Sequence, residues 1–283
     1  MGTSKRERQK AGHQARLAYE QRLKEQADRR RRVLVLSTAT AALALAVIVG
    51  VILANRGGDE GVDTAGTTTT TTTVASLVPP PPGPGATISG PTPCPPTDGT
   101  AERTTEFEQA PPMCIDPAKS YTARFLTSVG PIDVALDTTR TPETTNNFVV
   151  LARYGYYDGS AVFRADDSID ILQGGAPITN SNSDPGPGYT IPDEGGKFTY
   201  VPGQLVMART AQPNSAGAQF FFTTGPDSAN LDTSGTYVVF GTTDETGVSL
   251  LQQVLASAVP EPSASYHTPQ PPMVVQRVEI LEG

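Results

Sequence analysis

The stretch GQLVMARTAQPNSAGAQFFFT, residues 203–223, decides the fold. Two apolar runs, Gly203–Ala208 and Gln219–Thr223, flank a loop that contains Pro, Asn, Ser and Gly. Short apolar runs bounded by turn residues are typical of β-strands. The stretch therefore predicts two strands with a loop between them.

Similar patterns extend in both directions. Tyr121–Ser128 alternates apolar and polar residues, a turn follows at Val129–Pro131, and the alternation resumes over Ile132–Leu136. This pattern predicts a hairpin. Further strands are expected at Tyr237–Phe240 and Met273–Leu281.

Two windows have the signature of helices. Thr141, Pro142 and Glu143 provide an N-cap residue, a proline at the first helical position and an acid in the first turn, and Gly155 ends the predicted helix. A second helix fits Gly247–Ser257. Residues 119–283 are thus predicted to form a mostly β domain, a closed antiparallel barrel that leaves no exposed sheet edge.

The composition excludes several kinds of chemistry. The two histidines, His13 and His267, lie in opposite ends of the chain, so no His metal site and no His base for a Ser or Cys nucleophile is expected. Two cysteines are too few for a Cys-rich zinc module. We expect no metal and no cofactor. The net charge of −8 divides into +7 on residues 1–32 and −15 on the remainder, and an acidic body argues against nucleic acid as a partner.

Residues 33–54, from Val33 to Ala54, contain no charge and are dense in Ala, Val, Leu and Ile. At about 1.5 Å per residue the segment is long enough to cross a hydrocarbon core of about 30 Å. We predict a single transmembrane helix; a cleaved signal peptide is the alternative, but 32 hydrophilic residues precede the segment. Arg29–Arg32 abut its amino end, so the positive-inside rule places the basic tail, residues 1–32, in the cytoplasm. The predicted location is the cell membrane, single-pass, with the C-terminal domain extracytoplasmic.

Residues 55–93 combine seven consecutive threonines, Thr67–Thr73, with the run Pro79–Pro82. This composition buries too little apolar surface to offset chain entropy, and it predicts a disordered Thr/Pro-rich linker. Cys94 and Cys114 are the only cysteines, and both lie on the predicted extracytoplasmic side, where disulfides persist. We expect a disulfide that closes the loop 94–118 ahead of the domain; a reactive thiol is the alternative.

Eight short motifs follow one another along residues 121–280. They are Thr141–Phe148, Tyr156–Gly159, Phe163–Arg164, Leu172–Gly175, Pro187–Tyr189 with Asp193–Glu194, Gly203–Ala208, Pro213–Phe221 and Val238–Gly241. In this order and spacing the chain resembles the cyclophilin family of peptidyl-prolyl cis/trans isomerases. The resemblance implies an eight-stranded closed barrel with two capping helices. Together with the predicted anchor, it is similar to a membrane-anchored bacterial, actinobacterial-like form.

The activity that this resemblance implies agrees with the residues present. Rotation about an X-Pro bond faces a barrier of about 18 to 20 kcal/mol, because the nitrogen lone pair is delocalised into the carbonyl. A catalyst needs an apolar pocket for the proline ring and a fixed cation or donor that favours the twisted amide. An arginine suits this task because it is permanently charged and rich in donors.

The resemblance implies roles for eleven residues by position. Arg164 looks like the catalytic arginine, and Gln173 and Gln219 look like the glutamines that position it and the substrate backbone. Phe221 corresponds to the floor of the proline pocket, with Ile171 and Leu231 as its walls. The other expected substrate contacts are Ala208, Arg209, Thr210, Asn214 and Tyr237.

The chain departs from the family pattern in two site segments, each of which carries one extra residue: Arg164 to Gln173, and Met207 to Gln219. Residues 165–170, ADDSID, replace the usual apolar sequence, so either Asp170 or Ile169 replaces the expected pocket phenylalanine. A carboxylate of this segment (Asp166, Asp167 or Asp170) that lies near Arg164 would neutralise the cation or hold it away from substrate.

The sequence supports three hypotheses about function. The leading one is a peptidyl-prolyl cis/trans isomerase that acts on X-Pro bonds of exported proteins and assists their folding outside the membrane. The alternatives are a catalytically weak cyclophilin-like module that binds Pro-containing segments at the cell envelope, and a structural role at the envelope. The expected partners are proline-containing polypeptides and, through Val33–Ala54, the membrane; the chain is expected to be a monomer.

Overall fold

The computed structural model describes residues 75–233 and 236–283. The predicted basic tail, the predicted transmembrane helix and the first part of the predicted linker lie outside the described residues. Within the part of the chain that is described, no helix combines the length and the apolar character that a membrane crossing requires.

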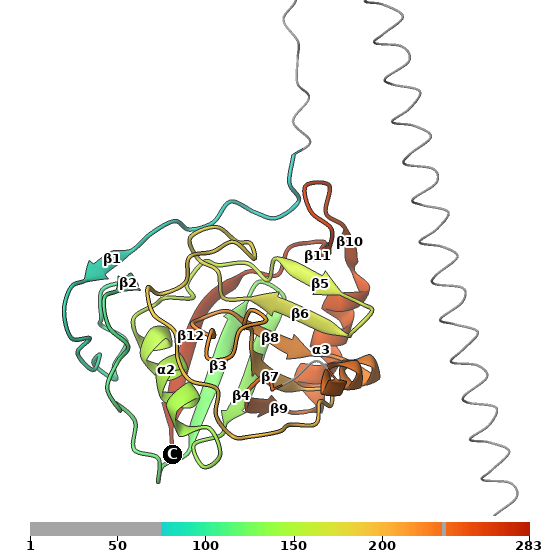
Figure 1. The fold of residues 1–283 in the computed structure, drawn as a ribbon. Helices are drawn as coiled ribbons and strands as arrows, with labels where there is room; N and C mark the ends of the chain where they lie inside the picture. The colour runs from blue at the N-terminus through green and yellow to red at the C-terminus, as the bar shows by residue number, and fades with distance from the viewer. Residues whose placement is uncertain (1–74, 234–235) are drawn as a thin grey trace, which may run out of the picture. The chain divides into compact units, whose positions relative to one another are not determined.

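One antiparallel sheet dominates the described residues (Figure 1). Its ten strands are ordered β10-β11-β5-β6-β8-β7-β9-β4-β3-β12. Their bounds are β3 Tyr121–Thr127, β4 Gly130–Leu136, β5 Arg164–Asp166, β6 Ile171–Gly174, β7 Gln204–Met207, β8 Phe220–Thr223, β9 Val239–Thr243, β10 Ala258–Pro260, β11 His267–Pro269 and β12 Val275–Glu282. The predicted hairpin is confirmed as β3 and β4, and the stretch 203–223 supplies the neighbouring strands β7 and β8.

The prediction of a closed eight-stranded barrel is wrong, since the described sheet has ten strands and its order leaves β10 and β12 at the two edges. Residues 159–162 do exchange backbone hydrogen bonds with residues 273–275, at the start of β12. The pairing there amounts to an isolated bridge, Ala161 to Val274, and not a ladder. Pro271 and Pro272 precede this bridge and lack the N–H groups that a longer ladder requires.

Both predicted helices are present: α2 (Pro142–Arg153) lies against β12, and α3 (Glu245–Ala256) lies against β4 and β11 (Figure 1). Helix α3 begins two residues earlier than predicted, because the Asp244 carboxylate accepts a hydrogen bond from Gly247 N at 2.9 Å. A 3-10 helix, η1 (Pro226–Thr233), connects β8 and β9.

The start of α2 differs from the prediction. Thr141 precedes the helix, but its hydroxyl donates to the Asp137 carbonyl at 3.0 Å and makes no cap. The Glu194 carboxylate accepts hydrogen bonds from the backbone N–H groups of Glu143 and Thr144 instead. A carboxylate at a helix amino end also interacts favourably with the helix dipole, so a distant residue performs the cap.

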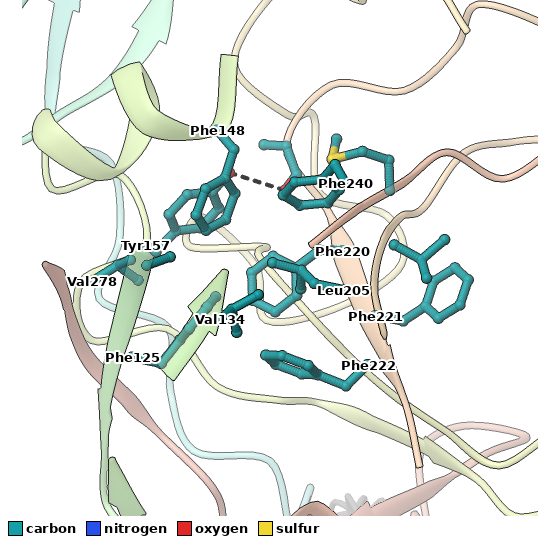
Figure 2. Close-up of a cluster of buried hydrophobic side chains, with 14 of the residues drawn as sticks. Phe125, Val134, Phe148, Tyr157, Leu205, Phe220, Phe221, Phe222, Phe240 and Val278 are labelled. Atoms are coloured by element: carbon teal, nitrogen blue, oxygen red, sulfur yellow. Dashed lines mark hydrogen bonds between the residues drawn. The ribbon is translucent and has the colours of Figure 1, made fainter. Parts of the chain in front are cut away.

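The core lies between α2 and the sheet and is built from aromatic rings (Figure 2). Phe148 of α2 stacks on Tyr157 with ring centroids 5.0 Å apart, and Phe125 of β3 contacts Phe220 and Phe222 of β8 at 5.5 and 5.3 Å. Successive side chains of a strand point to opposite faces. Phe220 and Phe222 therefore enter the core, and Phe221 between them faces the other side of β8.

Residues 75–93, which the sequence assigns to the disordered linker, are extended and packed on the domain; we call this segment the strap. Its strand β1 (Ala86–Ile88) pairs in parallel with β2 (Thr104–Phe107). The strap is held at its start by Glu261, whose carboxylate accepts from Leu77 N at 3.0 Å, and further along by Asn180, which donates to the Pro79 carbonyl at 3.1 Å. Composition alone missed these contacts because their partners lie about 100 or more residues away.

The predicted disulfide between Cys94 and Cys114 is confirmed. The loop that it closes is also held to α2, since Asn146 Oδ1 accepts hydrogen bonds from Cys114 N at 2.7 Å and from Ile115 N at 3.2 Å. The Tyr154 hydroxyl donates to the Pro93 carbonyl at 2.8 Å. The loop is thus held to α2, and the strap to the residue that follows α2.

Candidate active site

The predicted site residues converge on one cavity of about 500 Å³. Ten of the eleven line it: Arg164, Ile171, Gln173, Ala208, Arg209, Thr210, Gln219, Phe221, Leu231 and Tyr237. Asn214 does not, because it holds a neighbouring turn: its side-chain oxygen accepts from Asp193 N at 2.8 Å.

A chain of hydrogen bonds fixes the polar wall of this cavity. Strands β5 and β6 place Arg164 directly opposite Gln173, and Arg164 Nη1 donates to Gln173 Oε1 at 2.9 Å. Gln173 Nε2 in turn donates to Gln219 Oε1 at 2.9 Å and to Asn182 Oδ1 at 3.2 Å. The guanidinium is therefore oriented before any substrate arrives.

Apolar side chains form a recess next to this polar wall. Phe221 and Ile171 are each 3% exposed, and Leu231 is 6% exposed. The ring of Tyr237 meets that of Phe221 edge-on, with centroids 5.8 Å apart. An apolar recess beside a fixed guanidinium can hold a small ring next to a donor.

Arg209 lines the cavity, but its N–H groups donate hydrogen bonds to the surrounding loops. Its guanidinium donates to the carbonyls of Thr236, Thr210 and Gln212 at 3.2 to 3.3 Å and lies 5.2 Å from the centroid of the Tyr237 ring. Asp193 is 3.8 Å away. The arrangement indicates that Arg209 holds the walls of the cavity in place.

The acidic segment 165–170 divides into three roles. Asp166 Oδ2 accepts from Arg164 Nη2 at 2.8 Å, and Asp167 is exposed. Asp170 faces η1, where its carboxylate accepts from Asp227 N at 2.8 Å. Of the two residues expected to replace the pocket phenylalanine, Ile169 lines the cavity and Asp170 does not.

The pKa of Asp166 lies below its usual range. Burial by itself raises this pKa, but hydrogen bonds from Ser168 and the bond and charge of Arg164 outweigh the burial. The carboxylate is therefore ionised wherever the protein is folded at neutral pH.

One wall of the cavity was not predicted from the sequence: the loop from Asn182 to Thr190. Asp184 shapes this loop by accepting hydrogen bonds from the N–H groups of Ile178, Thr179 and Gly186 at 2.9 to 3.0 Å. The motif Pro187–Tyr189 is the signal within it, although no role was assigned to these residues. Across the described residues, no group of three or more His, Cys, Asp or Glu side chains is arranged to hold a metal ion.

Fold and site together define a protein in which an antiparallel sheet carries an apolar recess beside a fixed arginine. Residues 122–280 match the family described as cyclophilin-type peptidyl-prolyl cis-trans isomerase/CLD. The chain belongs to this family, and it is a peptidyl-prolyl cis-trans isomerase of the cyclophilin type.

Individual relatives agree in name. The chain is 30% identical over 178 residues to the peptidyl-prolyl cis-trans isomerase cyp18 of Streptomyces antibioticus, covering 56% of this chain and 98% of that protein. It is 36% identical over 104 residues to a peptidyl-prolyl cis-trans isomerase of Synechococcus elongatus, covering 37% of this chain and 67% of that protein. A crystal structure of a cyclophilin-type isomerase of Cryptosporidium parvum aligns with a TM-score of 0.47 at 25% identity, covering 58% of this chain and 99% of that one.

Proposed function

We propose that this isomerase acts on X-Pro bonds of exported polypeptides and assists their folding outside a membrane to which Val33–Ala54 anchors it. The observation that supports the chemistry is the series of hydrogen bonds from Arg164 to Gln173 and on to Gln219, beside the apolar recess of Phe221. A proline ring fits the recess, and the peptide bond before it then lies on the side of the guanidinium.

The catalytic effect follows from differential stabilisation. A planar X-Pro amide keeps its nitrogen lone pair delocalised, whereas the twisted amide localises charge that a fixed cation and its N–H groups stabilise. Arg164 uses one N–H on Gln173 and one on Asp166, and a guanidinium has five, so donors remain for substrate. Each 1.4 kcal/mol or so of such stabilisation speeds rotation about tenfold.

Two features support the extracytoplasmic setting. The Cys94–Cys114 disulfide suits an oxidising compartment. The uncharged segment 33–54, preceded by four arginines, suits a single crossing with the basic tail in the cytoplasm. The similarity to a Streptomyces protein supports an actinobacterial-like form of the isomerase domain.

A second candidate function is a binding module with slow turnover, and the contact between Asp166 and Arg164 favours it. The carboxylate lies 2.8 Å from the guanidinium on which catalysis depends. If the ion pair removes most of the useful charge, the recess binds proline without accelerating rotation.

Two-dimensional exchange NMR on an X-Pro peptide, with the full-length oxidised chain in detergent, separates the two. We expect exchange cross-peaks between cis and trans that are lost with Arg164→Ala and kept with Arg124→Ala, which removes an exposed arginine on β3 that pairs with Asp133. Shifted peptide resonances without exchange would replace the enzyme by the binding module. An Arg164→Ala protein as active as wild type would refute the assigned role.

The location has its own test. Protease added to intact spheroplasts should digest a C-terminal tag and leave an N-terminal tag protected. Digestion of the N-terminal tag alone would reverse the proposed topology.

A further inference from the structure

Asp166 is placed beside Arg164 by the geometry of β5. Residues two apart in a strand project from the same face, and Arg164 and Asp166 are opposite Gln173 and Ile171, both of which line the cavity. The carboxylate therefore shares the catalytic face of the sheet. The side chains of Arg164 and Asp166 are 27% and 25% exposed, so solvent screens their pairing only in part.

The carboxylate cannot readily move away from this position. Its Oδ1 accepts hydrogen bonds from Ser168 Oγ at 2.6 Å and from Ser168 N at 3.1 Å, which leaves Oδ2 for Arg164. An Asp that accepts from the backbone two residues on forms a local turn of its own. Arg164 is thus held from two sides, by Gln173 and by Asp166.

The neighbouring acids do not share this role. Asp167 is exposed, and Asp170 is engaged with the start of η1. Asp184 lines the cavity, but its two oxygens accept hydrogen bonds within its own loop. Among the carboxylates of the segment 165–170, Asp166 is the one that the structure pairs with the catalytic guanidinium.

We infer that Asp166 is a positioning residue that attenuates the isomerase, because it orients Arg164 and at the same time offsets part of the positive charge that the twisted amide requires. This inference rests on the proposed function. The negative charge of Asp166 opposes stabilisation of the transition state, whereas binding of the proline ring depends on the apolar recess. Attenuation therefore acts on kcat and leaves KM nearly unchanged.

The test compares Asp166→Asn, Asp166→Ala and Asp167→Asn in the full-length chain by exchange NMR over a range of peptide concentrations. Asp166→Asn removes the charge and keeps an oxygen acceptor, so kcat should rise about three- to tenfold, the scale expected for a partly exposed charge next to the reacting group, with KM changed less than twofold. Asp166→Ala removes charge and restraint together and should fall below Asp166→Asn. Asp167→Asn is the matched control, since it removes an equal charge one residue away, and it should behave as wild type.

The outcomes are distinguishable. If wild type is active and Asp166→Asn has the same or a lower kcat, while thermal unfolding shows that the variant is folded, the attenuation is overturned. The proposed function would still stand. An equal rise in Asp167→Asn would show a general effect of surface charge and would also overturn it. No turnover in wild type or in any variant would refute both, whereas turnover that appears only in Asp166→Asn would support the attenuation and favour the slow binding module for the natural chain.

Discussion

Opening the Cys94–Cys114 disulfide should destabilise the domain without changing its catalysis. The bond closes a loop of 20 residues, and removing such a constraint from the unfolded chain costs about 3 kcal/mol in the chain-entropy model. The backbone contacts of the loop with Asn146 do not involve the sulfur atoms and should persist. With a urea dependence of about 2 to 3 kcal/mol per molar, the unfolding midpoint of Cys94→Ala/Cys114→Ala should fall by about 1 to 1.5 M.

The assay is urea unfolding followed by tyrosine fluorescence, for which the nine tyrosines and the absence of tryptophan suit the chain. Wild type under reducing conditions is the control, since its loop is open while its side chains are intact. Its midpoint should match that of the double variant. No residue of 94–118 lines the cavity, so kcat/KM of the folded protein should not change. A reduced wild type that unfolds at the oxidised midpoint would refute the reasoning.

Two further predictions concern aromatic side chains. Phe221→Ala should raise KM at least tenfold because the recess loses its floor. Phe222→Ala opens a cavity in the core, so it should lower the free energy of unfolding by about 3 to 5 kcal/mol and leave KM unchanged. Enzyme kinetics and urea unfolding of both variants check this. Burial raises the pKa of Tyr156 and of Tyr157, so the folded state keeps their protons at a pH where unfolded tyrosines, with a pKa of about 10, lose them. The free energy of unfolding should therefore fall as the pH rises above about 10, less steeply in Tyr157→Phe; equal urea midpoints of wild type at pH 9 and pH 11 would contradict this.

The sequence was most informative where a pattern is local. Alternation located the hairpin of β3 and β4, and the stretch 203–223 located β7 and β8. Ten of the eleven residues assigned by resemblance line one cavity. Some of them, such as Arg164 and Gln173, meet because they lie opposite each other in paired strands.

The tertiary structure decided which acid meets the arginine. Asp166, Asp167 and Asp170 were equivalent in the sequence, because nothing local shows the register in which β5 pairs with β6. One residue of difference would turn the side chain of Asp166 to the other face. The pairing with β6 continues to Asp166, and this brings the carboxylate to Arg164.

Contacts between residues far apart in the sequence also could not be predicted from the sequence. Glu194 caps α2, Glu261 and Asn180 hold the strap, and the loop from Asn182 completes the cavity. Local periodicity sets which residues become strands and helices, and it was sufficient to predict both helices and the strands β3, β4, β7, β8, β9 and β12. Which side chain caps a helix, holds the strap or pairs with a guanidinium depends on which distant segments pack together. Only the folded structure fixes that packing.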